Sequence, residues 1–404
     1  MEAPLEGIRI VEIANYVAAP SAGALLADLG AEVIKVEVPQ GEIYRQTRPR
    51  HMGHKVDFDG SPAFQMDNRG KRSLALDLGS PDARAALLRV IDGCDVVLTN
   101  LLPERQTRYG LDPETLRKRQ PGLIYASLTG YGGRGAEANR PGFDYAAYWA
   151  RTGFMDSTRE PDAPPAYLRP GTGDHAAGMS LVAGILAALR VRDRTGKGQD
   201  VDVSLLQIGL YIQGNDLSMT LITGKSPKRH DRNTPVNPLW NQYPVKGGRW
   251  LFLVMIESDR YWHELCRALE RPELAAEERF ADAPKRFRAN RELVAILDEV
   301  FLSRTLEEWE AILERYSLIW SPMRELSELL DDPQARAMGY FHSVDHPVLG
   351  KFETMGPPFQ MSNFELRAHQ PAPELGADGE SVLREAGLSE SEIRTALPAS
   401  SDDA

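Results

Sequence analysis

The feature that most constrains this chain is the stretch Arg169–Gly178, which reads RPGTGDHAAG and leads into an apolar run of helical spacing that ends at Leu189. Its glycines allow a tight backbone turn that other residues adopt only at a cost. Asp174 follows where the helix should begin. An aspartate there fits two roles, the common one of a helix cap and that of an ionised nucleophile at the end of a ligand-facing glycine loop. The rest of the chain decides between them.

The first part of the chain alternates strands and helices. Residues 7–14 are typical of a buried strand, 20–30 of a helix and 31–37 of a second strand, which together predict a βαβ unit and a parallel sheet. Further strands are expected within 68–78, at 94–99 and at 123–128. Ligands of open α/β sheets bind beyond the carboxyl ends of the strands. The expected ligand rim therefore holds Asn15–Val17, Asn100–Leu101 and Thr129–Tyr131.

A second region begins after a break in composition. Residues 224–240 are rich in proline and basic side chains and form a candidate boundary. Beyond it, residues 243–256 predict a hairpin, and helical patterns fill 259–271 and 290–315, with another helix starting near Ser321. This region is typical of a small α+β domain. Short strands are expected between 339 and 358, and two closing helices at 379–387 and 389–397.

Composition narrows the function classes. The 404 residues leave room for two domains, and the net charge of −11 argues against non-specific binding to nucleic acid, although local arginines can still hold an anionic small ligand. Only Cys94 and Cys266 are present, which allows no disulfide framework and no zinc site, so we expect no metal. The sequence predicts no signal peptide and no membrane span, and we expect a cytoplasmic enzyme.

The loop Gly130–Gly135 matches the dinucleotide-binding pattern G-x-G-x-x-G. The residues after it do not open the long apolar helix that the phosphate site of that motif requires. We interpret it as a flexible glycine loop, and predict neither a nicotinamide nor a flavin cofactor. A nicotinamide oxidoreductase that uses this loop is a rival hypothesis, and protection from thermal unfolding by NAD but not by CoA would favour it.

Four blocks of the sequence resemble one known family. They are 4–13 with 27–37, 68–78, 129–132 with 140–144, and 173–199, where the last contains Gly173-Asp174, Gly178 and Thr195-Gly-Lys-Gly-Gln199. In these blocks the chain is similar to the class III CoA-transferases, also called CaiB/BaiF, which include formyl-CoA transferase and carnitine CoA-transferase. The resemblance covers nearly the whole chain and is loosest between about 225 and 340.

The resemblance implies the architecture. It implies an α/β fold with a doubly wound, Rossmann-like large domain built from both chain ends, here 1–224 and 325–404, that binds CoA. It implies a smaller α+β middle domain at 225–324. It also implies an interlocked homodimer in which each chain threads through its partner.

The resemblance also implies the chemistry. Asp174 matches the catalytic aspartate, whose carboxylate would attack an acyl-CoA thioester and pass through a mixed anhydride to an aspartyl-CoA thioester. A carboxylic acid acceptor would then take over the CoA. By the same matching, the residues that contact CoA are Tyr16, Val17, Leu76, Asn100, Leu101, Arg108 and Arg140. Ordinary alternatives stand beside these roles, since Arg108 also fits a solvated helix charge and Leu76 a core residue.

At several positions the sequence differs from the motifs of the family, and these differences exclude some of the family's reactions from what we expect. Val17 replaces a glutamine and Val38 an arginine of formyl-CoA transferase, and no glycine run occurs near 230–245, so formyl or oxalyl transfer is not expected. The 2-methylacyl-CoA racemases of the family use a histidine where this chain has Phe143, which cannot exchange a proton. His175 is the only nearby substitute.

Two alternatives to transfer therefore stay open, an acyl-CoA racemase and a non-catalytic acyl-CoA-binding protein in which Asp174 only caps a helix. Aromatic side chains that could line an acyl pocket, although on helices they more often belong to the core, are Tyr145, Tyr148, Trp149 and Trp240.

Overall fold

The computed structural model describes residues 3–49 and 58–398, which pack into two compact units. The first unit comprises Met1–Met155, Tyr167–Ser226 and Ala337–Ala404, so both ends of the chain contribute to it. The second comprises Asp156–Ala166 and Pro227–Arg336. Each unit has its own buried apolar core.

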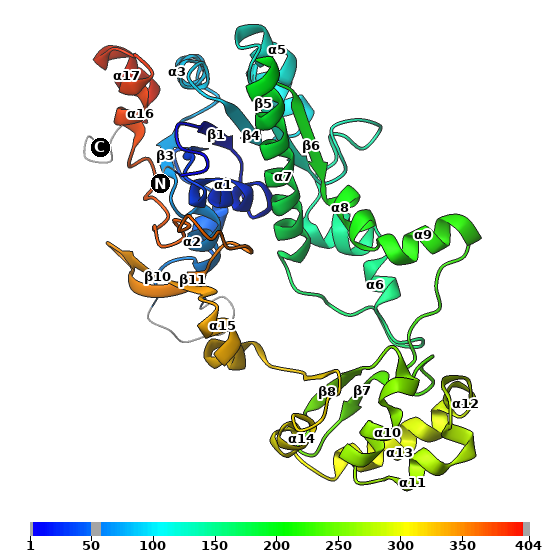
Figure 1. Ribbon diagram of the computed structural model, residues 1–404. Helices are drawn as coiled ribbons and strands as arrows, with labels where there is room; N and C mark the ends of the chain where they lie inside the picture. The colour runs from blue at the N-terminus through cyan, green and yellow to red at the C-terminus, as the bar shows by residue number, and fades with distance from the viewer. Residues whose placement is uncertain (1–2, 50–57, 399–404) are drawn as a thin grey trace. The chain divides into compact units, whose positions relative to one another are not determined.

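The first unit is built on a six-stranded sheet in which every neighbouring pair of strands is parallel (Figure 1). Its strands are β1 (Arg9–Ile13), β2 (Glu32–Glu37), β3 (Arg72–Ala75), β4 (Val96–Thr99), β5 (Ile124–Thr129) and β6 (Asp200–Ser204). They run in the order β3-β2-β1-β4-β5-β6, which confirms the predicted α/β class. The chain reverses its winding direction between β1 and β4, and such a switch point opens a crevice at the carboxyl ends of the two strands.

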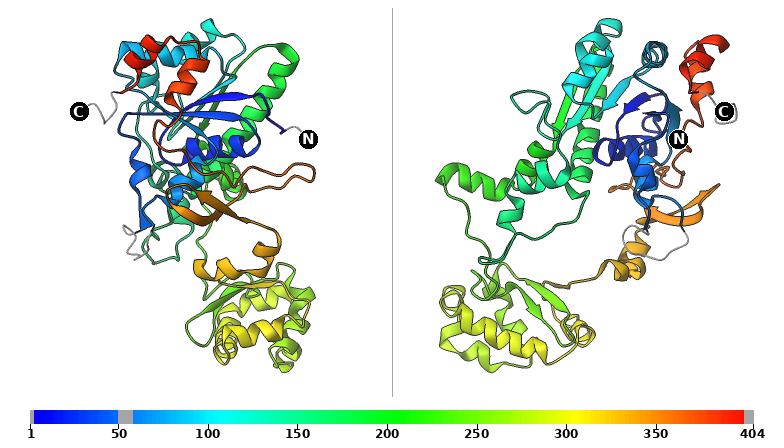
Figure 2. Two further views of the ribbon diagram at one scale, coloured as in Figure 1. Left: turned by 90° about the vertical axis from the view of Figure 1, so that its left-hand side faces the viewer. Right: turned by 180° about the vertical axis from the view of Figure 1, so that it is seen from behind.

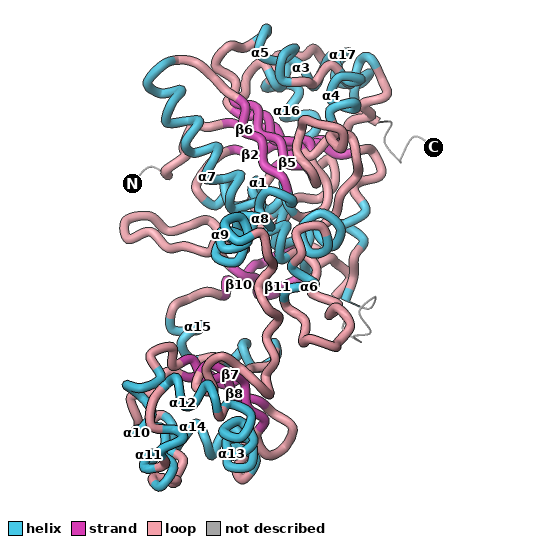
Figure 3. The backbone as a smooth tube through the Cα atoms, turned by 90° about the vertical axis from the view of Figure 1, so that its right-hand side faces the viewer, coloured by secondary structure: helices cyan, strands magenta, loops and turns pink. Residues whose placement is uncertain are grey.

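Helices cover both faces of this sheet (Figure 3). On one face α1 (Ala18–Asp28) packs side by side with α7 (Thr172–Thr195). On the other face lie α3 (Pro81–Ile91) and the C-terminal helices α16 (Gly379–Glu385) and α17 (Glu390–Ala396), and α17 contacts α3 (Figure 2). By length and composition α7 is apolar enough to cross a membrane, but a core helix passes the same test, and the buried side of α7 belongs to the core that packs on the sheet.

Shorter elements complete the first unit and the connections to it. They are η1 (Ile43–Gln46), α2 (Pro62–Asn68), α4 (Pro103–Tyr109), α5 (Pro113–Arg119), the π-helical η3 (Asp144–Ala150), α6 (Phe154–Ser157), α8 (Leu205–Ile212), α9 (Gly214–Thr223), α15 (Pro333–Ala337) and the antiparallel pair β10 (Phe341–His346) and β11 (Gly350–Met355). Residues 130–135 form a loop, as predicted, and the next helix after this loop begins only at Asp144.

The second unit packs helices on a small antiparallel sheet of order β7-β8-β9. Its elements are β7 (Trp240–Pro244), β8 (Trp250–Val254), α10 (Ser258–Ala268), α11 (Glu273–Ala276), η4 (Glu278–Phe280), α12 (Ala283–Arg288), α13 (Asn290–Leu302), α14 (Leu306–Leu313), β9 (Trp320–Pro322) and η5 (Leu326–Asp331). The predicted hairpin is β7–β8. Trp262, Phe301 and Trp309 are fully buried at its core.

Two local expectations were wrong in this unit. The helix expected near Ser321 is absent, because Trp320–Pro322 pairs with β8 as β9, and this sheet pairing overrides the local Ser-Pro signal. The helical pattern at 290–315 is divided into two helices at Thr305, whose side chain and that of Glu308 form a capping box that starts α14.

Close contact between α1 and α7 depends on a glycine. A Cβ at Gly178 would lie 2.2 Å from the Ser21 hydroxyl oxygen and 2.8 Å from the Ala18 carbonyl oxygen. The second contact is with backbone, which cannot rotate away, so the helices meet at this distance only without a side chain. The packing sets how α7, and with it Asp174, approaches the end of β1.

We expect Gly178→Ala to destabilise the protein by about 1–3 kcal/mol, because the added methyl group forces two packed helices apart. Gly214→Ala is a matched control in α9, where a Cβ would meet nothing within 4 Å. Urea unfolding of both variants measures the difference. Equal stability of the two variants would show that the contact is not tight in solution.

Candidate active site

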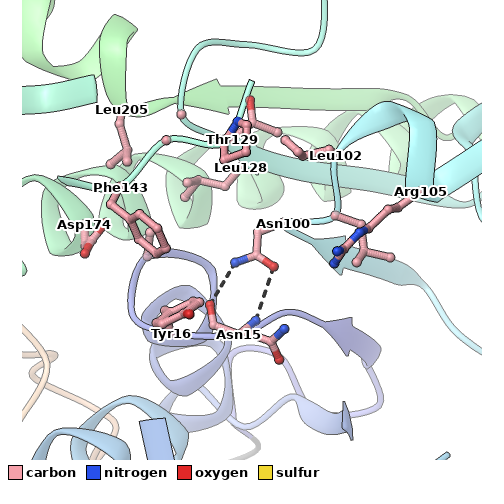
Figure 4. A pocket seen from close by; sticks show the side chains of 15 residues that line it. Asn15, Tyr16, Asn100, Leu102, Arg105, Leu128, Thr129, Phe143, Asp174 and Leu205 are labelled. Carbon is pink, nitrogen blue, oxygen red and sulfur yellow. Dashed lines mark hydrogen bonds between the residues drawn. The ribbon is translucent and has the colours of Figure 1, made fainter. Parts of the chain in front are cut away.

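A pocket lies at the switch point of the sheet, beyond the carboxyl ends of β1 and β4 (Figure 4). The Asn15 N–H donates to Asn100 Oδ1 over 3.2 Å, and Asn100 Nδ2 donates to the Asn15 carbonyl over 2.8 Å, so the two strand ends are clamped together. The pocket is lined by Asn15, Tyr16, Ala18, Asn100, Leu101, Leu102, Arg105, Leu128, Thr129, Gly130, Pro141, Gly142, Phe143, Asp174 and Leu205.

Asp174 reaches this pocket from the first turn of α7. The helix begins at Thr172 and its N-cap is Gly171 with a φ of 85°, so Asp174, the third residue of the helix, does not occupy the N-cap position that the capping alternative requires. Its carboxylate is half-buried and accepts no hydrogen bond from residues 3–49 or 58–398. A nucleophile needs such an unblocked lone pair.

Gly173 lets this turn pack against the core. A Cβ there would lie 2.3 Å from Tyr148 Cγ and 2.4 Å from Asp144 Oδ1. The Asp144 carboxylate in turn accepts the Gly171 N–H over 2.8 Å, which holds the glycine turn in place. Asp144 therefore orders the loop that presents Asp174, and no signal in the sequence pattern indicated this.

The electrostatic environment raises the pKa of Asp174 to about 7. Burial is the largest cause, and the nearby carboxylates of Asp144 and Asp67 add to it, while His175 acts in the opposite direction. A carboxylate in this environment is poorly solvated, and its charge is costly. Both properties make it more basic, and so a better nucleophile, than an exposed aspartate.

His175 is held by an aspartate from a distant part of the sequence. Its Nε2 lies 3.1 Å from Asp67 Oδ1, and the Asp67 side chain is only 2% exposed. Burial disfavours the imidazolium, but the hydrogen bond and the charge of Asp67 outweigh this effect and raise the pKa of His175. The pair favours the protonated imidazolium form of His175 next to Asp174.

Tyr16, at the end of β1, has an unusual backbone. Its φ is 68°, in the left-handed region that non-glycine residues rarely adopt, and its N–H donates to Glu42 Oε2 over 2.6 Å. Its ring meets Phe143 edge-on, with centroids 5.1 Å apart, and lies 6.4 Å from Tyr44. Figure 4 shows the Tyr16 and Phe143 rings beside Asp174. The three rings make an aromatic wall at the acidic end of the pocket.

A buried ion network lies under this wall. Lys35 Nζ lies 3.2 Å from Glu12 Oε1 and 2.7 Å from Glu42 Oε1, and Lys71 Nζ lies 2.7 Å from Glu12 Oε2. Lys71 also donates to the Asp67 carbonyl over 2.8 Å. The network joins the start of α1, the segment before η1 and the end of α2. Through the network, Glu42, which accepts the Tyr16 N–H, is connected with Asp67, which pairs with His175.

The structure brings together some of the residues predicted from the sequence but not others. Tyr16, Asn100, Leu101 and Asp174 line the same pocket. The side chains of Val17 and Leu76 are buried in the core. Arg108, near the end of α4, is exposed with its guanidinium 5.9 Å from the Tyr109 ring, and the exposed Arg140 pairs with Glu137. These last four residues do not line the pocket.

The aromatic residues considered for an acyl pocket lie elsewhere. Tyr148 and Trp149 belong to the core of the first unit, the Tyr145 hydroxyl donates to the Leu168 carbonyl, and Trp240 starts β7 in the second unit. The sequence reasoning missed Arg105, which lines the pocket. In residues 3–49 and 58–398, no three His, Cys, Asp or Glu side chains are arranged to hold a metal ion.

Comparison with known proteins gives one family. The model of CoA-transferase family III matches residues 5–379. The (R)-2-hydroxy-4-methylpentanoate CoA-transferase of Clostridioides difficile is 31% identical over 96% of this chain and 97% of its own. The cinnamoyl-CoA:phenyllactate CoA-transferase of Clostridium sporogenes is 32% identical over 96% and 94%. A crystal structure of a CAIB/BAIF family protein from Brucella suis superposes with a TM-score of 0.85 at 31% identity, covering 96% of this chain and all of that one.

The raised pKa of Asp174 predicts a cost in stability. The unfolded chain has the ordinary value of 3.8 and the folded chain a value of about 7, so the penalty is absent below about pH 4, grows as the pH rises, and is complete above about pH 7. After allowance for partial solvent exposure, we expect Asp174→Asn to stabilise the protein by about 1–2 kcal/mol at pH 8.

Urea unfolding of the wild type and of Asp174→Asn at pH 8 and pH 5 measures this cost. The gain is expected to be smaller at pH 5, where the folded wild type carries a protonated Asp174. A gain that is absent at pH 8, or equal at both pH values, would contradict the electrostatic environment derived above.

Proposed function

The chain belongs to CoA-transferase family III, whose members transfer CoA between acids, and we propose that it does so through a covalent thioester between CoA and Asp174. CoA thioesters are therefore its substrates. The observation that carries the proposal is the unbonded Asp174 carboxylate on the wall of the switch-point pocket. A carboxylate used only to cap a helix would accept backbone N–H bonds, and this one accepts none from the part of the chain that the structure describes.

The proposed reaction has four steps, and each step breaks one bond to an acyl carbon and forms another. Asp174 attacks the thioester carbonyl of the donor, and CoA thiolate leaves, which forms a mixed anhydride. The thiolate attacks the aspartyl carbonyl and releases the donor acid as a carboxylate, which leaves aspartyl-CoA. The acceptor carboxylate attacks this thioester, which breaks the C–S bond, releases CoA thiolate again and forms a second anhydride. The thiolate then attacks the acceptor carbonyl, which gives the new acyl-CoA and regenerates the Asp174 carboxylate.

No proton is gained or lost in this sequence, so the site needs no general acid or base. Its tasks are to keep Asp174 ionised, to stabilise each oxyanion and to exclude water, which would hydrolyse the anhydride. The first turn of α7 offers backbone N–H groups and the positive end of the helix dipole near Asp174. The aromatic wall of Tyr16, Tyr44 and Phe143 offers an apolar cover for it.

Binding of CoA at the switch point is proposed with the contacts that the resemblance suggests. Tyr16, Asn100 and Leu101 would meet the thiol arm from the pocket wall. Val17, Leu76, Arg108 and Arg140 stay predictions for contacts outside the pocket lining. Because Val17 and Val38 replace a glutamine and an arginine of formyl-CoA transferase, we do not expect formyl or oxalyl transfer.

Racemisation is the alternative that the site supports less well. Phe143 lines the pocket where a racemase would need a proton donor and acceptor. His175, the only nearby substitute, is engaged by Asp67. Exchange of the α-proton of a 2-methylacyl-CoA would favour the racemase, and acyl-CoA binding without any chemistry would favour a binding protein.

We also propose that the protein is a cytoplasmic homodimer, interlocked as in the family, with domains at 1–224 plus 325–404 and at 225–324. Large apolar side chains on α8 and α9 support an interface: Tyr211 is 81% exposed, Leu221 78% and Ile222 83%. Such a patch is unusual on a monomer and is typical of a protein-protein contact.

Trapping with borohydride tests the covalent step. We expect an acyl-CoA donor to leave aspartyl-CoA on the protein, and borohydride to reduce this thioester to an alcohol at Asp174, which peptide mapping by mass spectrometry locates. Asp174→Ala should bind CoA and lose all transfer, while Asp202→Ala, which removes an acidic side chain from the middle of β6, should retain the mark. Full transfer activity in Asp174→Ala would sink the assignment.

The pH dependence of transfer tests the role of the charges around Asp174. Because the nucleophile must be ionised, kcat/KM should fall as the pH drops through about 7. His175 lowers the pKa of Asp174, so His175→Gln should move this acidic limb to higher pH by roughly half a unit to one unit. His263→Gln, on the exposed side of α10, is the control. A limb that stays in place or moves to lower pH would rule out the electrostatic role of His175.

A further inference from the structure

Aromatic rings lie around the Asp174 carboxylate and are open to a ligand. The Phe143 and Tyr16 residues beside Asp174 are 56% and 39% exposed (Figure 4), and their ring planes cross at 84°. The Tyr44 ring continues this wall. Burial raises the pKa of Tyr44 to about 12, and the charges of Asp67 and Asp174 add to the effect, so the Tyr44 hydroxyl faces the same carboxylates. Exposed rings on a pocket wall offer apolar contact area to a ligand.

The charges in this space are negative or already paired. Asp144 and Asp67 are the carboxylates that act on Asp174, and His175 is the group that acts in the opposite direction. The His175 Nε2 is held by Asp67, and its Nδ1 lies against Gly171, where a Cβ would be only 3.6 Å away. A second carboxylate that entered this space would therefore meet like charges, and the imidazolium beside it is already engaged.

The rest of the pocket wall is almost without charge. Among the described residues that line it, Asp174 is the one anion, and the one lysine or arginine is Arg105. Figure 4 shows Arg105 on the far side of the clamp formed by Asn15 and Asn100, away from Asp174. The immediate surroundings of the nucleophile are therefore aromatic and acidic.

The proposed reaction brings both acids into these surroundings. In the first mixed anhydride the acyl carbon of the donor acid is bonded to an oxygen of Asp174, and in the second anhydride the acyl carbon of the acceptor acid is bonded there. The first atoms of either acyl chain therefore lie against whatever surrounds Asp174, whichever way the chain then points. Donor and acceptor are subject to the same selection.

Resting on the proposed function, we infer that donor and acceptor are both monocarboxylic acids with an apolar chain, and that the site rejects dicarboxylic acids. The rings of Tyr16, Tyr44 and Phe143 remove water from an apolar chain. A second carboxylate would lose its water beside Asp67 and Asp144 and gain no free cation in exchange. Selection thus rests on repulsion of the wrong acid as well as on attraction of the right one.

Two donors of the same shape test the inference in the first half-reaction. In 5-methylhexanoyl-CoA two terminal methyl groups stand where glutaryl-CoA has the two oxygens of its free carboxylate. Each donor is mixed in excess with the wild-type protein, and formation of aspartyl-CoA is followed by acid quenching and intact mass, which needs no acceptor. We expect the second-order rate constant to be about a hundredfold higher for 5-methylhexanoyl-CoA, because burial of an unpaired charge is opposed.

A cation on the aromatic wall should reverse this preference. We expect Phe143→Lys to react with glutaryl-CoA at least about tenfold faster than the wild type does, and with 5-methylhexanoyl-CoA more slowly. Failed folding would not produce such a gain. Phe287→Lys, which makes the same change at a half-exposed phenylalanine of α12 in the second unit, is the matched control and should keep the wild-type ratio.

Three results would overturn the inference and leave the proposed function standing. The first is a wild-type ratio below about tenfold. The second is a Phe143→Lys variant with the wild-type ratio. The third is a reaction with glutaryl-CoA that Arg105→Gln abolishes, since the second carboxylate would then reach the far end of the pocket. A panel of acyl-CoA donors of which none forms a thioester at Asp174 would instead remove the proposed function and this inference together.

Discussion

The candidate site depends on the buried network of Glu12, Lys35, Lys71 and Glu42. Both lysines and Glu12 are fully buried, so each charge depends on its partners, and removal of one would leave an uncompensated charge at a cost of about 3–5 kcal/mol. Glu42 also accepts the Tyr16 N–H, and Lys71 also holds the end of α2. The network therefore contacts the segment with the strained backbone of Tyr16 on one side and the segment that carries Asp67, the partner of His175, on the other.

The second constraint is the approach of α7 to the sheet. Gly173 and Gly178 remove the side chains that would hold α7 away from Asp144 and from α1. The approach brings the carboxylates of Asp67, Asp144 and Asp174 close together, which raises the pKa of Asp174. Folding thus places Asp174 where its charge is unfavourable. In the proposed reaction, covalent attachment to an acyl group or to CoA would remove that charge and relieve the repulsion.

Much of the fold could be predicted from local patterns. The alternation at 7–37 predicted β1, α1 and β2, and Pro81 and Gly30 marked a helix start and a helix end, because capping and periodicity act within a few residues. The gathering of Asn15, Tyr16, Asn100 and Leu101 around one pocket followed from the parallel order of the strands, whereas Val17, expected on the same rim, is buried. The prediction failed where a distant segment decided the outcome, as at Trp320–Pro322, which pairs with β8.

By itself, the sequence determined the class of the fold, the family and the position of Asp174 at the start of a glycine-presented helix, since these are carried by residues close together in the chain. Only the tertiary structure decided which charges surround Asp174 and which arginine faces the pocket. Asp67 and His175 are 108 residues apart, and Arg105 and Arg108 lie on one short helix with similar local sequence. Their roles depend on packing distances between separate elements, and no periodicity or cap signal records those distances.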